Sequence, residues 1–414
     1  GHVEGAFGLE RTMDVLATTL GMDPVALRLA NFAERDQSRD RPYSANGLRA
    51  CYEAGARRFG WGVRGNGEGG GELVTGLGVG RERLLSGGGP SAPETAPLPA
   101  PTRRRGVGVA ACIWAAGGGP PAYATVRLNS DATIDVLSGT QDLGTGSRTI
   151  LAQVAAESLG ATLADVRVVL GDTERTPYAG NSWGSMTTAS VGPAVRVAAE
   201  EARHRLLEAA GQLLECHVDD LITRDSTIVT RDGARRLTFA EVTKKLGNVM
   251  IMGQGSRGPN PDNVALMSFG VQFAEVEVDV ESGVVRVVRL TAAHDAGRII
   301  NPLLAESQLE GGILQGLGYA LFEERQLDGA TGRPVNASLH SYKIPTMADV
   351  PLIEAFCVPG SDTVANHVGA RGLAEPPIIP TAPAIANAVA NALGVELCEL
   401  PLTPWRVLEA LRRG

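Results

Sequence analysis

Four short clusters of glycine and other small residues constrain this sequence more than any other feature, because each of them adjoins a predicted helix or strand. The chain has 52 glycines among 414 residues, about twice the share expected from average usage. Glycine lets the backbone come close to a ligand, and the free N–H groups at a helix N-terminus favour an anion such as phosphate. Part of the excess lies apart from these clusters, in residues 62–105, where Gly, Pro and Ser predict a flexible insert.

The composition excludes several classes of protein. The net charge is −8 and the one basic run, Arg103 to Arg105, is too short for the phosphate contacts that nucleic-acid binding requires. No run of about 18 apolar residues predicts a membrane span. The five cysteines form no C-x-x-C pair and the six histidines no H-x-x-H pair, so we expect no iron-sulfur, zinc or other metal ligands from the protein.

The scattered cysteines are typical of a reducing compartment, so we expect a cytoplasmic protein, with the periplasm as the alternative. The chain opens at Gly1 without a methionine. We therefore expect that its natural N-terminus is missing from this sequence.

Hydrophobic periodicity predicts helices and strands in mixed order, with hairpins that argue against a purely doubly wound sheet. The fold class that we predict is α+β, with mixed sheets and helices. The expected helices lie in two segments between 8 and 33, with Leu9, Met13, Leu16 and Leu20 on one face of the first, and over 147–159, 192–213, 302–322 and 381–393; the expected strands form hairpins over 107–137 and 271–290, with a further strand at 166–170.

The first two clusters both precede helices. Residues 139–146 read GTQDLGTG and residues 184–193 read GSMTTASVGP. Either could hold an anion or a polar ring on backbone amides and small hydroxyls. A tight strand-to-helix turn or a polar N-cap explains each of them about as well, and neither matches the P-loop or the G-x-G-x-x-G fingerprint.

The third cluster, residues 295–302, leads into a glycine-rich helix that carries Gln308 and Gln315. Close approach of a ligand and close packing of another helix both explain these glycines, and we expect Asp295 to pair with Arg298.

The fourth cluster, residues 369–377, reads GARGLAEPP. Pro376 disfavours the α region for Glu375, so we expect this glutamate in an extended, stiff segment. A carboxylate held in this way, with Arg371 as its nearby charge, suits a general base, although most glutamates in such loops are simply solvated.

In this order, GTQDLGTG, GSMTTASVGPAV, DAGRIINP with ESQLEGGILQGLG, and GARGLAEPP resemble the molybdopterin-binding subunit of the xanthine dehydrogenase and aldehyde oxidase family. The segments GAFGLERTMDVLATTLGMDPVALRLANF and PYSANGLRACYEAGARRFGW resemble it too. The resemblance runs from near Gly5 to about Leu408, apart from the Gly/Pro-rich insert. It implies that this chain is the C-terminal portion of such a subunit.

The resemblance assigns roles to residues in the clusters. Glu375 matches the family's glutamate beside the metal, which acts as the base when an electron-poor carbon is hydroxylated with oxygen from water. Molybdenum in this family is held by the pterin, so no protein ligand is expected. The expected cofactor contacts are Gln141, Gly144, Gly146, Ser185, Thr188, Ala189, Ser190 and Gln308.

The resemblance also implies a cofactor and partners. We expect molybdopterin, in its cytosine dinucleotide form, with molybdenum. The substrate would be an aldehyde or an N-heteroaromatic compound, and electrons would pass to iron-sulfur and FAD-binding subunits. The upstream half of the subunit, which carries the family's G-G-x-F-G segment, is expected as a further partner. Ala374 stands where glycine is commoner.

We predict four segments: a helical start over 1–61, the flexible insert over 62–105, a subdomain over 106–270 with two cofactor loops, and a subdomain over 271–414 with Glu375. Two alternatives remain open. One is a catalytically incomplete homologous fragment that serves only in folding or assembly. The other is a plain nucleotide-binding domain, which the absence of nucleotide fingerprints disfavours.

Overall fold

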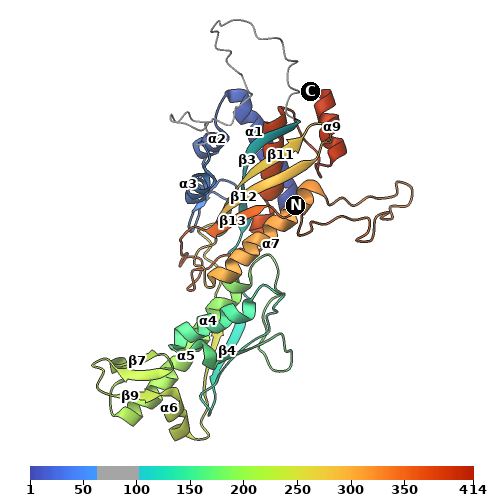
Figure 1. Ribbon diagram of the computed structural model, residues 1–414. Helices are drawn as coiled ribbons and strands as arrows, with labels where there is room; N and C mark the ends of the chain where they lie inside the picture. The colour runs from blue at the N-terminus through green and yellow to red at the C-terminus, as the bar shows by residue number, and fades with distance from the viewer. Residues whose placement is uncertain (63–101) are drawn as a thin grey trace, which may run out of the picture.

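The computed structural model describes residues 1–62 and 102–414, which form two lobes, each built on its own four-stranded sheet (Figure 1). We call residues 116–266 the lower lobe and the other described residues the upper lobe. The predicted insert over 62–105 lies almost wholly outside the described residues. The α+β fold with mixed sheets is confirmed.

The helices are α1 (His2–Leu20), α2 (Pro24–Ala30), α3 (Leu48–Phe59), α4 (Ser147–Leu159), α5 (Thr187–Leu214), α6 (Phe239–Leu246), α7 (Pro302–Leu321), α8 (Thr381–Leu393) and α9 (Pro404–Arg413), with short 3-10 turns η1 (Leu163–Asp165), η2 (Val218–Asp220) and η3 (Pro376–Ile378). The strands are β1 (Arg35–Asp36), β2 (Arg41–Pro42), β3 (Arg103–Ala115), β4 (Tyr123–Leu128), β5 (Ile134–Ser138), β6 (Val166–Leu170), β7 (Leu221–Arg224), β8 (Thr227–Thr230), β9 (Arg236–Thr238), β10 (Ile251–Ser256), β11 (Met267–Asp279), β12 (Val285–Asp295) and β13 (Leu352–Cys357).

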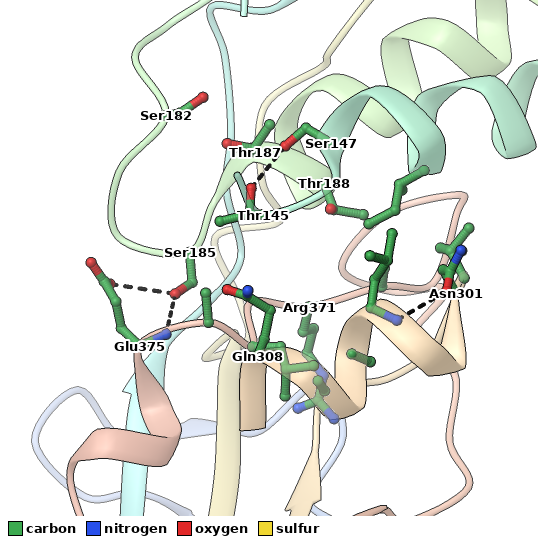
Figure 2. Close-up of a pocket in the computed structure, with 18 of the residues that line it drawn as sticks. Thr145, Ser147, Ser182, Ser185, Thr187, Thr188, Asn301, Gln308, Arg371 and Glu375 are labelled. Atoms are coloured by element: carbon green, nitrogen blue, oxygen red, sulfur yellow. Dashed lines mark hydrogen bonds between the residues drawn. The ribbon is translucent and has the colours of Figure 1, made fainter. Parts of the chain in front are cut away.

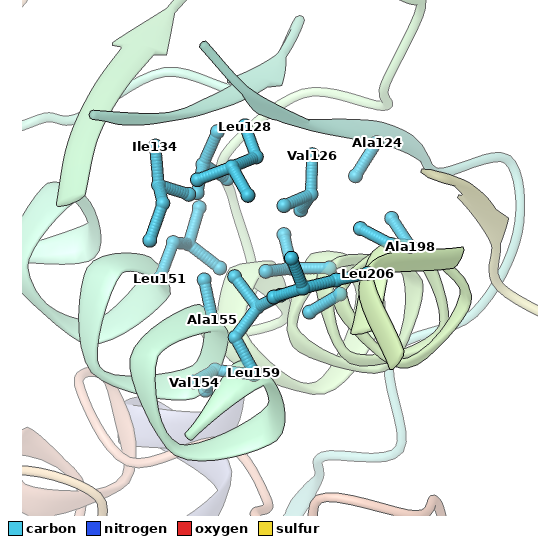
Figure 3. Close-up of a cluster of buried hydrophobic side chains, with 14 of the residues drawn as sticks. Ala124, Val126, Leu128, Ile134, Leu151, Val154, Ala155, Leu159, Ala198 and Leu206 are labelled. Atoms are coloured by element: carbon cyan, nitrogen blue, oxygen red, sulfur yellow. The ribbon is translucent and has the colours of Figure 1, made fainter. Parts of the chain in front are cut away.

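The lower lobe packs α4 and α5 against a sheet with the strand order β10-β4-β5-β6. The predicted β4–β5 hairpin is confirmed, and α4 connects β5 to its parallel neighbour β6. Alternate residues of these strands, such as Val126 and Ile134, point at buried residues of the two helices, such as Leu151 and Leu206 (Figure 3). This core holds the N-termini of α4 and α5 at one end of the lobe.

Helix α5 begins at Thr187, five residues earlier than the sequence pattern predicts, and includes Pro193 in its interior. Proline has no N–H to donate to the carbonyl four residues earlier, which is that of Ala189. In this protein the buried Arg257 donates from Nε to that carbonyl at 3.1 Å. The second small-residue cluster is therefore mostly the first two turns of α5.

The upper lobe has a sheet with the strand order β13-β12-β11-β3 between two helical layers. Helix α3 covers one face, where Val271 and Phe273 point, and α8 covers the other, where Ala274 and Val276 point. The predicted β11–β12 hairpin is confirmed. Strand β3 precedes the lower lobe in sequence but pairs along its length with β11, so the chain passes through the upper sheet before it builds the lower lobe.

The two N-terminal helices are bounded by residues that commonly end or begin helices. Gly21 ends α1 in the left-handed conformation, and Asp23 caps α2 by accepting from the N–H groups of Val25 and Ala26. The predicted apolar face of α1 is largely exposed instead of buried, since Leu9 is 62% and Leu20 56% exposed. Among residues 1–62 and 102–414, no helix is long and apolar enough to span a membrane.

Candidate functional site

A cavity of about 490 Å³ lies where the two lobes meet. Its lining comes from lower-lobe residues within 143–150 and 182–188 and from upper-lobe residues within 296–315 and 370–378. Most of these residues belong to the four small-residue clusters or to the helices that follow them. In Figure 2, Glu375 and Ser185 lie at one end of the cavity, Asn301 lies at the other, and Gln308 lies between them. Folding thus brings together clusters that are far apart in the sequence.

The loop before α4 is held by its own acidic side chain. Asp142 accepts from the N–H groups of Gly144, Gly146 and Arg148 at 3.0 to 3.3 Å. Partial burial alone would raise the pKa of Asp142, but these hydrogen bonds lower it below its ordinary value. A carboxylate of the chain thus already takes the N–H of Arg148 in the first turn of α4 and those of two residues in the loop before it, which leaves fewer donors for an anion at this end of the helix.

Gln141 ties this loop to the second one. Its amide group donates to the carbonyl of Gly139 at 2.8 Å and accepts from the N–H of Ser182 at 2.9 Å. The side chain of Gln141 is not part of the cavity lining, whereas Thr145 and Ser147, beyond the loop's tip, do line it. Gln141 therefore holds together two loops that border the cavity and does not itself line it.

The α5 end supplies hydroxyl groups and an open helix N-terminus. Thr187 and Thr188 line the cavity, and no side chain caps this helix. Ala189 is fully buried, whereas Ser190 is half-buried and accepts from the N–H of Gly119 at 3.0 Å, and neither side chain lines the cavity. Neither helix has a side-chain cap at its N-cap residue, but Asp142 takes an N–H of the first turn of α4, so the head of α5 suits an anion better.

Helix α7 brings amide side chains to the upper wall. Asn301 caps the helix by accepting from the N–H of Leu304, and Gln308, two turns further on, lines the cavity. The expected pair of Asp295 with Arg298 does not form, because Arg298 bonds Glu157 of α4 across the lobes at 2.6 Å.

Glu375 directly precedes the turn η3, is half-buried and lines the cavity. The predicted extended conformation is wrong: its backbone is in the right-handed helical region, with φ −89° and ψ −33°, although proline follows. The hydroxyl of Ser185 accepts from the backbone N–H of Glu375 at 2.8 Å and lies 3.4 Å from its carboxylate oxygen Oε2 (Figure 2). Tertiary contacts thus override the local preference imposed by Pro376.

The turn that carries Glu375 rests on three buried side chains of the upper sheet. Ser268 donates to the carbonyl of Gly372 at 2.6 Å, Gln272 donates to that of Pro377 at 2.6 Å, and the thiol of Cys112 donates to that of Pro376 at 3.4 Å. Burial raises the pKa of Cys112 above the ordinary range, so this thiol stays protonated and can donate. These bonds fix the backbone on both sides of Glu375.

A buried ion cluster anchors the same segment four residues before Glu375, at Arg371. Arg371 bonds Asp295 at 2.5 Å and lies 3.5 Å from Asp362, and all three side chains are at most 4% exposed. Arg371 is among the residues that line the cavity, but its guanidinium is paired with these two aspartates, so it is not the charge partner of Glu375 that the sequence suggested. The neighbouring His294 is fully buried, and burial lowers its pKa to about 3, so its ring is neutral.

Four of the nine predicted site residues line the cavity, namely Ser185, Thr188, Gln308 and Glu375. The other five do not line it: Gln141, Gly144 and Gly146 lie in the loop before α4, and Ala189 and Ser190 lie in the first turn of α5. Lining residues that sequence reasoning did not single out include Thr145, Ser147, Thr187, Asn301 and Trp183. For Thr145, Ser147 and Thr187, the sequence signal was the run of hydroxyl residues where each of the first two clusters meets its helix.

Comparison with known proteins gives a consistent result. A family model described as a molybdopterin cofactor-binding domain matches residues 91–351. A xanthine dehydrogenase molybdenum-binding subunit of Escherichia coli O157:H7 is 33% identical over 427 residues, which cover 99% of this chain and 52% of the relative. An aldehyde oxidoreductase molybdenum-binding subunit of Escherichia coli K12 is 32% identical over 426 residues, which cover 99% of this chain and 51% of the relative.

Among solved structures, quinoline 2-oxidoreductase from Pseudomonas putida 86 has the same fold, with a TM-score of 0.81 at 24% identity over 100% of this chain and 52% of that one. The chain spans about half the length of the relatives that it matches. Because the family model matches more than half of the sequence, the protein belongs to the molybdopterin cofactor-binding domain family, as its four clusters predicted.

Proposed function

We propose that this chain forms the molybdenum-cofactor half of a hydroxylase that oxidises an aldehyde or an N-heteroaromatic compound, with water as the source of oxygen. The observation that carries the proposal is the cavity between the lobes, in which Glu375 faces a wall of hydroxyl and amide groups. The names of the similar subunits, which include a xanthine dehydrogenase and an aldehyde oxidoreductase, support the substrate class.

The donor groups of the cavity fit a large polar cofactor that brings its own metal ligands. Among the described ranges 1–62 and 102–414, no group of three or more His, Cys, Asp or Glu side chains could hold a metal ion. The cavity instead offers hydroxyls, amides and the uncapped N-terminus of α5, which suit a pterin ring and its phosphate groups. A Cβ added at Gly144 would meet no heavy atom within 4 Å, so a ligand could approach the backbone there.

We assign the phosphate end of the cofactor, in the cytosine dinucleotide form, to Thr187 and Thr188 at the head of α5. Gln308 would contact the ring system from the opposite wall, and Ser185 and Glu375 would mark the metal end. Gln141, Gly144 and Gly146 would shape the loop before α4, and Ala189 and Ser190 would belong to the first turn of α5 behind it. When bound, the cofactor supplies the two-electron oxidation and the activated oxygen.

Glu375 would take a proton from the attacking oxygen nucleophile, since its carboxylate is half-buried beside the cavity and its backbone is fixed by Ser185 and the upper sheet. A base held in one place lowers the entropy cost of the proton transfer. The two electrons would then pass to iron-sulfur and FAD-binding partner subunits, and the rest of the subunit would complete the pocket.

Metal and pterin analysis tests this proposal. The full-length subunit, purified with its partners, should contain molybdenum and pterin in equal amounts, about one of each per chain. A full-length protein that folds but holds neither would support the alternative, a fragment that acts only in folding or assembly.

A further inference from the structure

Ser185 has an unusual backbone conformation for its residue type. Residues Trp183 to Met186 form a tight turn closed by a hydrogen bond from the N–H of Met186 to the carbonyl of Trp183 at 3.1 Å. Gly184 and Ser185 both have positive φ, +56° and +61°, as in a type I′ turn. Glycine, asparagine and aspartate dominate such positions, so a serine here calls for a compensating contact.

The compensating contact lies in the other lobe. The hydroxyl of Ser185 accepts from the N–H of Glu375 at 2.8 Å and is placed to donate to the carboxylate of the same residue at 3.4 Å. One hydroxyl can make both bonds, because it has one donor and two acceptor lone pairs. In Figure 2 both interactions converge on the Ser185 oxygen at the end of the cavity that Glu375 occupies.

The backbone of the turn also packs against the Glu375 segment. A Cβ added at Gly372 would lie 2.7 Å from the carbonyl oxygen of Ser185 and 3.0 Å from its Cβ. The indole N–H of Trp114, on β3 of the upper sheet, donates to the carbonyl of Gly184 at 3.1 Å. The turn before α5 is thus docked on the upper lobe at three places, with the Ser185 hydroxyl at the centre.

We propose that Ser185 is a positioning residue that sets the carboxylate of Glu375, instead of serving mainly as a cofactor contact. This inference rests on the proposed role of Glu375 as the base. The strained turn aims the hydroxyl at both the main chain and the side chain of Glu375, so that the carboxylate keeps one orientation toward the cavity. It also couples that orientation to the docking of the two lobes.

Two variants of Ser185 separate the effect of the hydroxyl on Glu375 from the effect of the strained backbone. Ser185→Ala removes the hydroxyl and keeps an L side chain at φ +61°, whereas Ser185→Gly removes the hydroxyl and relieves the strain. Ser158→Ala is the control, because its hydroxyl bonds only the Val154 carbonyl within α4.

The direct readout is hydrogen exchange of the full chain, followed by mass spectrometry of a peptide that covers 372–378. Pro376 and Pro377 have no amide proton, so the Glu375 amide contributes strongly to this signal. Both Ser185 variants should speed its exchange about tenfold, the effect of losing one hydrogen bond, while the control should not. Unchanged exchange in both variants, or faster exchange in the alanine variant alone, would overturn the proposal.

The second readout combines steady-state kinetics of the full-length enzyme with a measurement of the molybdenum content of each variant. Both variants should lower kcat by about tenfold or more with KM and molybdenum content unchanged. A normal kcat despite faster exchange, or a loss that follows molybdenum content, would overturn the positioning role. If Glu375→Gln retained turnover, the proposed function would fail, but the exchange experiment would still decide whether the contact exists.

Discussion

Replacing Arg371 should destabilise the upper lobe strongly, because this side chain neutralises two buried carboxylates. Arg371 is 1% exposed, Asp295 4% and Asp362 0%. Arg371→Met would leave both carboxylates without their counter-ion and would also remove the bonds to the carbonyls of Ala45 and Met267. Breaking a buried pair by removing one partner costs about 3–5 kcal/mol, and we expect a loss of this size in the free energy of unfolding.

Urea unfolding at pH 7, followed by tryptophan fluorescence, measures this loss, since Trp61 packs against Phe273 in the core of the upper lobe. Arg413→Met is the matched control: Arg413 bonds Glu409 on the surface, where it is 76% exposed, so its removal should cost at most about 0.5 kcal/mol. A loss below about 1 kcal/mol for Arg371→Met, or an equal loss for both variants, would refute the reasoning that the buried cluster anchors the segment before Glu375.

Two further predictions concern the lower lobe. Gly255→Ala would place a Cβ 2.0 Å from the carbonyl oxygen of Ala194 on α5, so it should lower the free energy of unfolding in urea by about 1–3 kcal/mol. Gly258→Ala is the control and should cost little, because a Cβ there would meet open space; equal losses in the two variants would contradict the packing of β10 on α5. Asp142→Ala should cost about 0.5–2 kcal/mol at pH 7, because it uncovers the amides before α4. The pKa of Asp142 is lowered on folding, so the advantage of the wild type over this variant should be fully present above the ordinary value of 3.8 and should be lost as the pH falls through the lowered value. An advantage that does not change with pH throughout the acid range would contradict this.

Much of the fold could be predicted from the sequence because its local signals agree with its tertiary structure. Gly21 and Gly394 end helices in the left-handed conformation, and each directly follows an apolar periodic segment in the sequence. Asn301 caps α7 directly before Pro302, at the predicted start of that helix. The two hairpins also form where alternating residues flank short polar turns.

The errors arise where a distant residue decides the local structure. The sequence pattern predicts too late a start for α5, because Arg257, far along the chain, satisfies the carbonyl that Pro193 leaves free. It predicts an extended Glu375, because the bonds that bend this segment come from Ser185 and from the upper sheet. No periodicity or spacing in a single sequence encodes such pairings.

The candidate site was predictable in its parts and less so in its details. The order of the four clusters identified the family, and the match over residues 91–351 confirms it. The division between residues that line the cavity and those that support its loops, such as Gln141, depends on which way each side chain turns. For Gln141 that direction is set by Gly139 and by Ser182, which comes 41 residues later in the sequence.

The most direct test of the account is the turnover of the Glu375→Gln enzyme, expressed at full length with its partners. The change keeps the shape of the side chain and removes the base. We predict the same molybdenum and pterin content as in the wild type and a kcat lower by about 100-fold or more, the usual contribution of a general base. Turnover within twofold of the wild type at equal molybdenum content would contradict the role assigned to this carboxylate.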